Sequence, residues 1–199
     1  MKAEIENRLR LNLARVRALV DVYQREAGGG GGRRPVETVD LLRAAVVFLH
    51  ATLEDVLRTL LASRWPTTAD PDALERVGVL VGDEARTKVT LADLLRHRGK
   101  TVDDLIRESI LAHLERSSFN NVRDVKVALR RCGIDEHVVD GHASRLAAMM
   151  ARRHRIVHRA DVQEVSGRGY HVAASLGVGV VERWLSAVEA ACGSVVAKL

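Results

Sequence analysis

The chain has 199 residues, of which 47% are hydrophobic, 29% charged and only 3% aromatic. Strands draw on aromatic and β-branched residues together, so this composition favours helices over sheets. The formal net charge is +5, an excess too small to establish nucleic-acid binding by itself. No apolar run is long enough to cross a bilayer and the first residues lack a targeting pattern, so we expect a soluble, cytoplasmic protein.

Two long amphipathic helices are expected first. One is predicted from about Ala3 to Glu26, because its apolar residues recur at steps of three and four. The five glycines Gly28–Gly32 follow, and their backbone freedom predicts a flexible loop rather than a domain boundary. The second helix is predicted from Pro35 to about Ser63. Its apolar seam, from Val39 to Leu60, favours antiparallel packing against the first helix.

The middle of the chain, about residues 65–135, is predicted to hold shorter helices that elaborate a single domain spanning residues 1–199. Gly99 separates helices expected at residues 90–98 and 102–116, and a third is expected at 121–132. Val79–Val81 and Lys88–Val89 form a small ribbon at best. The predicted fold class is therefore all-α.

A long helix is then expected from about His142 to Arg159, and a final one from Val178 to Lys198, with a loop around Gly167 and Gly169. Buried, unpaired cations are very unfavourable, so a basic cluster at the end of the first of these helices predicts a solvated helix end or a site for a polyanion. The cluster places four arginines and two histidines within eight residues: Arg152, Arg153, His154, Arg155, His158 and Arg159.

This cluster has the groups that metal-free RNA cleavage requires. Attack by a 2′-hydroxyl on the adjacent phosphate needs a base, an acid and a cation; histidine titrates near neutral pH and arginine matches phosphate oxygens. On an ideal helix His154 and His158 share a face, whereas Arg153 and His158 lie ~140° apart. Arg153 would therefore join His158 through its long side chain, a distorted helix or a second copy of the chain.

The string Arg153-His154-x-x-x-His158 resembles the motif of HEPN ribonucleases, in which a polar residue follows the arginine and a histidine comes four to six residues later. The segments 41–55, 118–121 and 156–161 are similar to the RiboL-PSP-HEPN branch, and the resemblance spans roughly residues 35–198. It implies a HEPN-type helical bundle that dimerises, with both motifs facing one cleft.

The resemblance also implies a metal-independent RNA endonuclease that leaves a 2′,3′-cyclic phosphate. A toxin–antitoxin, phage-defence or RNA-processing setting is implied too, with an antitoxin or defence partner. We expect no cofactor and no metal ion. Ala160 stands where toxins silenced by AMP transfer carry a tyrosine, so we do not expect that control. Carried over by position, Arg153 and His158 are catalytic, His154 supports them and Glu54 is auxiliary. Apart from the resemblance, Arg152, Arg155 and Arg159 are candidates for binding the RNA backbone, and surface ion pairs with acidic neighbours are the alternative for these three arginines.

Two other functions remain open. The chain can be a non-catalytic HEPN module that binds RNA or a partner, or a DNA-binding regulator that uses residues 90–98 and 102–116 as a helix-turn-helix. Acidic residues on the second of those helices, Asp103 among them, would repel DNA phosphates. Structural interpretations also compete at single residues: bundle hydrogen bonding for His50, an ion pair for Glu54, packing for Trp65 and Trp184, and burial for Cys132 and Cys192.

Overall fold

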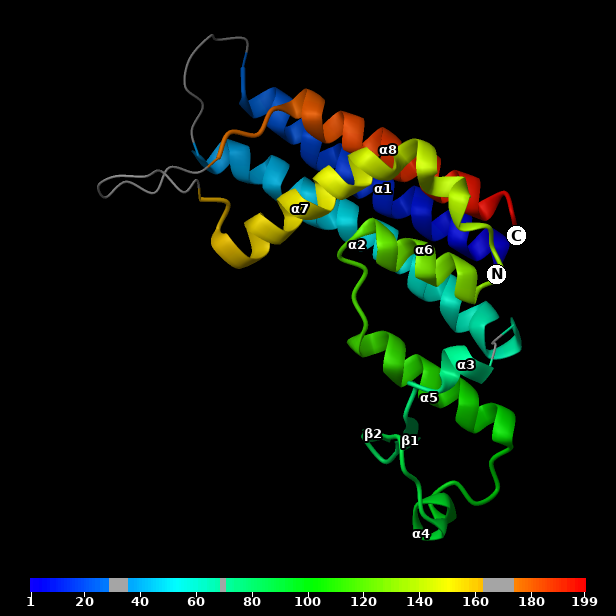
Figure 1. Cartoon of the computed structure of the whole chain (residues 1–199). Coiled ribbons are helices and arrows are strands. Elements are labelled where there is room, and N and C mark those ends of the chain that lie inside the picture. Colours follow the sequence, from blue (N-terminus) through cyan, green and yellow to red (C-terminus); the bar gives the residue numbers. More distant parts are fainter. Residues whose placement is uncertain (29–35, 69–70, 163–173) are drawn as a thin grey trace. The chain divides into compact units, whose positions relative to one another are not determined.

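A computed structural model describes residues 1–28, 36–68, 71–162 and 174–199 (Figure 1). These residues form eight α-helices, one 3-10 helix and one pair of short strands, which confirms the predicted all-α class. None of the described helices is long and apolar enough to cross a membrane. Most of the predicted glycine loop (residues 29–32) and the loop at Gly167 and Gly169 lie outside the described residues.

The chain divides into two compact units. The motif unit comprises Met1–Val56, Asn120–Val122 and His137–Leu199, and the middle unit comprises Leu57–Phe119 and Arg123–Glu136. The sequence predicted an elaborated region at about residues 65–135 within a single domain, and that domain organisation stays a prediction. The helix α2 (Val36–Thr68) contributes residues to both units.

In the motif unit, α1 (Lys2–Glu26) packs antiparallel to the first part of α2, as predicted. Arg8 pairs with Asp55, and Arg15 lies 5.0 Å from the ring centroid of Phe48, so numbers rise on α1 as they fall on α2. Steps of three and four along α1 predicted a buried stripe of Ile5, Leu9, Leu13, Val16, Leu19 and Tyr23. All of these are buried except Leu19, which is half-buried, and its neighbour Val20 is buried instead. This difference reflects the 3.6-residue period of the helix.

The helix α8 (Val178–Val196) contacts both α1 and α7 (Ala143–Arg159), and the short 3-10 helix η1 (Glu136–His142) leads into α7. Arg17 on α1 donates to Glu189 on α8 at 2.7 Å, and this exposed ion pair joins the two helices at the surface. Cys192 and Trp184 on α8 are buried, as the sequence predicted. Burial also raises the pKa of the Cys192 thiol to about 12, so the thiol is protonated at neutral pH and is a poor nucleophile.

The middle unit contains α3 (Pro71–Leu74), β1 (Val79–Val81), β2 (Glu84–Arg86), α4 (Leu91–Leu95), α5 (Val102–Arg116) and α6 (Val122–Arg131). The ribbon forms, but its second strand lies at Glu84–Arg86 rather than at Lys88–Val89, because Gly82, with φ of +62°, closes a tighter turn. The helix predicted at 90–98 is also shorter, since only Leu91–Leu95 is α-helical before the chain turns toward Gly99.

Helix α2 continues past its predicted end at Ser63 and reaches Thr68. Tertiary packing accounts for the extension, because Trp65 is fully buried in the middle unit. The Arg131 guanidinium lies 4.4 Å from the centroid of the Trp65 ring, and the His113 ring packs edge-on at 5.7 Å. This packing confirms the expected structural role of Trp65 and fixes the end of α2 against α5 and α6.

Candidate functional site

The motif lies on the last turns of α7, which runs as one uninterrupted α-helix from Ala143 to Arg159. Its buried face is formed by Leu146, Met149 and Met150. The helix ends where Ala160 adopts a left-handed conformation and donates its backbone N–H to the carbonyl of Arg155. The distorted helix that the sequence allowed as a way to unite Arg153 with His158 is therefore not present.

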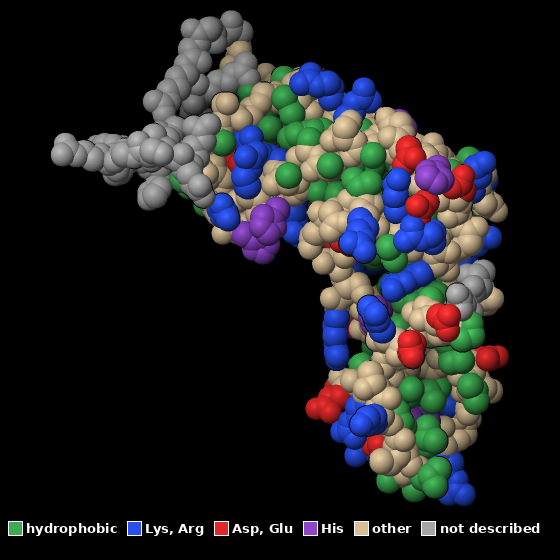
Figure 2. Space-filling model, viewed as in Figure 1, with side chains coloured by type: hydrophobic (Ala, Val, Ile, Leu, Met, Phe, Trp, Pro, Cys, Tyr) green, Lys and Arg blue, Asp and Glu red, His purple; other side chains and the backbone are tan. Residues whose placement is uncertain are grey.

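His154 and His158 are both exposed, and their ring centroids lie 4.6 Å apart at an interplanar angle of 46°. The prediction that they share one face of the helix is confirmed. In Figure 2, histidine atoms form a patch among Lys and Arg atoms at the end of α7. Two imidazoles in contact and open to solvent give this surface two proton-transfer groups side by side.

Arg153 leaves α7 on a different side. It follows Met150 by three residues and Leu146 by seven, so it continues the buried row of the helix. Its side chain is half-buried, and its Nε atom is buried without a hydrogen-bond partner among the described residues. Arg153 and His158 are therefore not brought together within one chain by the helix itself.

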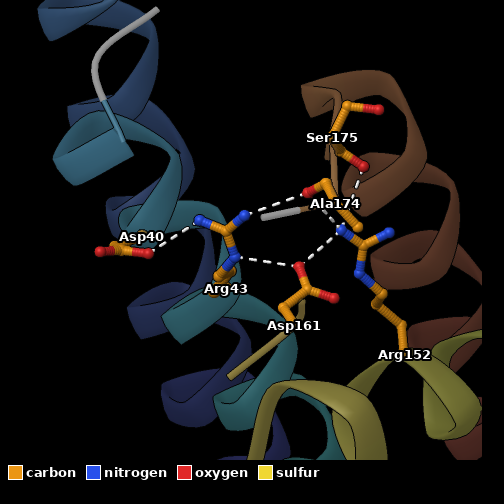
Figure 3. Close-up of polar contacts among 6 residues, drawn as sticks. All are labelled: Asp40, Arg43, Arg152, Asp161, Ala174 and Ser175. Atoms are coloured by element: carbon orange, nitrogen blue, oxygen red, sulfur yellow. Dashed lines mark hydrogen bonds and ion pairs between the residues drawn. The ribbon is translucent and has the colours of Figure 1, made fainter. Parts of the chain in front are cut away.

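Arg152 is buried, and its guanidinium is hydrogen-bonded within the protein (Figure 3). Its Nη2 atom donates to Asp161 Oδ2 at 2.6 Å and to the carbonyls of Ala174 and Ser175 at 2.9 and 3.0 Å. These interactions use the guanidinium to hold the chain together. The geometry does not support the expectation that Arg152 binds the RNA backbone, which the sequence alone did not separate from a structural role.

Arg43 on α2 binds the same acceptors from the opposite side. It donates to Asp161 Oδ2 at 2.9 Å, to the Ala174 carbonyl at 3.0 Å and to Asp40 at 2.8 Å. We call Arg43, Arg152 and Asp161 the arginine–aspartate clasp. All three are at most 8% exposed, and Asp161 is 1% exposed. The sequence reasoning missed Arg43 and Asp161 as functional-site residues; an arginine inside the apolar run of α2 was the available signal, because a buried cation requires a partner.

The turn held by the clasp is unusual in backbone conformation. Ala160 and Asp161 have φ values of 47° and 56°, and a left-handed conformation costs about 1–2 kcal/mol at each non-glycine residue. The Asp161 N–H donates to the Arg155 carbonyl, and the Asp161 carbonyl accepts the Ala174 N–H at 2.8 Å. The clasp thus joins α2, the end of α7 and the chain entering α8, and it holds the helix end that carries His158.

A groove borders the motif between α7 and the start of α8. It has a volume of about 760 Å³, and its polar wall includes His154, Arg155, Arg159 and the amides of Asn120 and Asn121. Its apolar wall is formed by the small residues Ala147, Ala148 and Ala151 together with Met150, Leu176, Val180 and Trp184. Arg155 and Arg159 are exposed, so both remain candidates for phosphate binding.

Glu54, the predicted auxiliary residue, lies on α2 beside His50. The distance between His50 Nδ1 and Glu54 Oε2 is 4.0 Å, the His50 side chain is 1% exposed, and that of Glu54 is 18% exposed. The burial of His50 agrees with its interpretation as a bundle residue. The ion pair with an arginine and the auxiliary role both stay predictions for Glu54.

The features of a helix-turn-helix are weak in the middle unit. Helix α4 has only five residues, and α5 begins with the exposed Asp103 and Asp104. Hydrogen bonds with Thr101 lower the pKa of the Asp104 carboxyl, so this group stays negatively charged at the start of α5. A negative first turn is poorly suited to entering a DNA groove.

The described side chains of the types that can ligate a metal do not cluster. Within the described part of the chain, no three His, Cys, Asp or Glu side chains are grouped so that they can hold a metal ion. His154 and His158 thus supply two such side chains at most.

No protein-family model, no curated protein and no solved structure matches the chain.

Proposed function

We propose that this protein is a metal-independent RNA endonuclease of the HEPN type, acting as a homodimer. The observation that carries the proposal is the exposed pair His154 and His158, in ring contact at the end of α7 and bordered by a groove that Arg155 and Arg159 line. Two imidazoles supply proton transfer and arginines neutralise phosphate charge, which are the functions that 2′-hydroxyl attack requires.

In the proposed reaction one neutral imidazole takes the proton of the 2′-hydroxyl as its oxygen attacks the adjacent phosphorus. The new bond joins the 2′-oxygen to phosphorus, and the bond from phosphorus to the 5′-oxygen breaks. A protonated imidazole gives its proton to the departing 5′-oxygen. The products are a 2′,3′-cyclic phosphate and a free 5′-hydroxyl. We assign His158 to one of these proton transfers and His154 to its support.

A second copy of the chain gives this chemistry a better geometry. The attacking and leaving oxygens lie roughly in line on opposite sides of phosphorus. His154 and His158 belong to one face of one helix and approach a phosphate from one side. A second copy that faces the first places an imidazole on the other side of the phosphate. The second copy can also supply Arg153 to the site, because Arg153 and His158 of one chain leave α7 on different sides. We therefore place the active site between two copies.

Other parts of the proposal follow from exposure of the histidine pair. An antitoxin or a defence-system partner would silence the enzyme by covering this surface. The location follows from two other points. The proposed substrate is cellular RNA, and both cysteines are free and buried rather than paired in a disulfide. We therefore place the protein in the cytoplasm.

The test compares the wild-type protein with His158→Ala on end-labelled RNA in the presence of EDTA. We expect cleavage to fall by about 10²–10⁴-fold in the variant, the usual contribution of one proton-transfer residue. His137→Ala is the matched control, because His137 is exposed in the same unit and pairs with Asp140 at 2.8 Å. It should cleave like the wild type.

The products provide a second check. A single 2′-deoxy substitution at the cleaved nucleotide should abolish the cut, and the new 3′ end should resist phosphatase until acid opens the cyclic phosphate. Wild-type cleavage that requires a divalent ion, or full activity in a clean preparation of His158→Ala, contradicts the proposal. Equilibrium sedimentation of both proteins tests the dimer independently of catalysis.

A non-catalytic RNA-binding module is the second candidate. One observation favours it, namely that Arg153 and His158 leave a straight helix on different sides. RNA binding by the wild type without any cyclic phosphate product, under conditions where dimers are present, would favour this function over the first.

A further inference from the structure

We propose that the groove between α7 and α8 binds one unpaired nucleotide of the RNA next to the phosphate that is cleaved. This inference rests on the proposed function for the reaction, although binding in the groove is measured separately from cleavage. The groove has a volume of about 760 Å³, within the range of about 300–1,000 Å³ typical of small-ligand sites. It would select single-stranded over paired RNA.

The lining of the groove matches the two parts of a nucleotide. Met150, Leu176, Val180 and Trp184 give it an apolar wall suited to the faces of a base. Asn120 and Asn121 stand in the same lining, and a side-chain amide has both the donors and the acceptor that base edges require. Unstacked bases in single-stranded RNA are recognised by this combination of apolar contact and edge hydrogen bonding.

The charges of the groove favour an anion. Among the described residues its lining contains three arginines and a histidine and no Asp or Glu. The charge of Arg152 is paired with Asp161. Arg155 and Arg159 are exposed in the same lining. Direct packing of the groove against a second copy would set Arg155 and Arg159 against their own counterparts, so in the proposed dimer the groove holds RNA rather than the partner chain.

The position of His154 connects the groove to the reaction. His154 lines the groove and its ring lies 4.6 Å from that of His158. A nucleotide whose base enters the groove therefore has its sugar and phosphates beside the histidine pair. The groove would position the RNA by holding the neighbouring nucleotide, without taking part in proton transfer.

The binding experiment uses the full-length His158→Ala protein, which keeps the RNA uncut. Ala151→Phe places a ring in the groove from an exposed position on α7, where no core packing is disturbed. Ala190→Phe, on the exposed face of α8 and outside the groove lining, is the matched control. Fluorescence anisotropy measures the affinity for a fluorescein-labelled single-stranded hexanucleotide and for an RNA duplex.

We expect Ala151→Phe to bind the hexanucleotide about tenfold more weakly, the effect of excluding one base from its site, while Ala190→Phe stays within twofold. Neither variant should change the affinity for the duplex. A hexanucleotide carrying 4-thiouridine should crosslink under ultraviolet light to peptides spanning residues 147–159 or 174–184, as read by mass spectrometry.

Equal hexanucleotide affinity in Ala151→Phe and Ala190→Phe, or crosslinks confined to other peptides, overturns the inference. A loss of dimer in Ala151→Phe with unchanged affinity for RNA also overturns it, since the groove would then be a protein interface. These results are distinguishable from a failure of the proposed function. If the wild type binds RNA through the groove but never cleaves it, only the proposed ribonuclease activity is contradicted. If Ala151→Phe cleaves hexanucleotides like the wild type, only the proposed nucleotide site in the groove is contradicted.

Discussion

Arg152 and Arg155 are three residues apart on α7, yet the two have opposite surroundings. Arg152 is 8% exposed and is held by Asp161 and two carbonyls. Arg155 is exposed at the rim of the groove. The difference teaches that a basic run in a sequence mixes arginines that build the fold with arginines that meet a ligand. Here the buried carboxylate of Asp161 distinguishes the two, because Arg152 pairs with it inside the protein and Arg155 does not.

Removing that carboxylate should produce the largest effect on stability. In Asp161→Ala, Arg43 and Arg152 lose their shared anionic partner while both remain buried, and breaking a buried ion pair in this way costs about 3–5 kcal/mol. We expect a loss of this size in urea unfolding monitored by circular dichroism. Asp140→Ala is the control, since it removes an ion pair at the surface and should change stability by less than about 1 kcal/mol. Equal stability of the two variants would show that the clasp is not structural.

The two arginines themselves allow a direct contrast. Arg152→Ala removes several charge-assisted hydrogen bonds but leaves Asp161 paired with Arg43, so we expect a loss of about 1.5–3 kcal/mol. Arg155→Ala removes an exposed side chain and should stay within about 0.5 kcal/mol of the wild type. The free energy of unfolding of both variants, measured in one denaturant series, checks this. Similar losses would erase the distinction between the buried and the exposed arginine.

Much of this fold was predictable from the sequence, because apolar periodicity reports local burial. The stripe on α1, the seam on α2 and the shared face of His154 and His158 all followed from the 3.6-residue period. The ribbon and the end of α2 were placed wrongly. Their positions depend on a tight turn at Gly82 and on packing around Trp65, which are tertiary effects.

The candidate site was predictable only in part, for a related reason. Sequence identified Arg153, His154 and His158, and the period of the helix showed that Arg153 diverges from His158. It did not show that Arg152 is buried, because its partners are Asp161 and the carbonyls of Ala174 and Ser175, up to 23 residues away. A single sequence does not indicate which residues meet across such distances.

The salt dependence of RNA affinity provides a further test of the contrast between the buried Arg152 and the exposed Arg155. Removing one arginine that binds a phosphate should reduce the slope of log affinity against log salt by about 0.7 for single-stranded RNA. We expect such a reduction in Arg155→Ala and again on adding Arg159→Ala, with the His158→Ala background used to prevent cleavage. Arg152→Ala should leave the slope unchanged. A reduced slope in folded Arg152→Ala protein would place that arginine on RNA after all.

The smallest expected effect concerns the turn after the motif. Ala160 has φ of 47°, a conformation that glycine adopts without the steric cost of a Cβ atom. Ala160→Gly should raise stability by about 0.5–1 kcal/mol, the steric cost relieved less the added entropy of the unfolded chain. Thermal unfolding measures this. A lower melting temperature would mean that packing of the Ala160 methyl group outweighs its backbone strain.

The arginine–aspartate clasp has a consequence for recognising distant relatives. Its three side chains come from positions 43, 152 and 161. Loss of Asp161 removes the anion that the two buried arginines share, and loss of both arginines removes the cations that neutralise Asp161. Substitutions at these positions are therefore expected to occur together during divergence. A buried arginine in the second long helix, with an arginine and an aspartate nine residues apart at the end of a later helix, is a more selective signature than an arginine and a histidine alone.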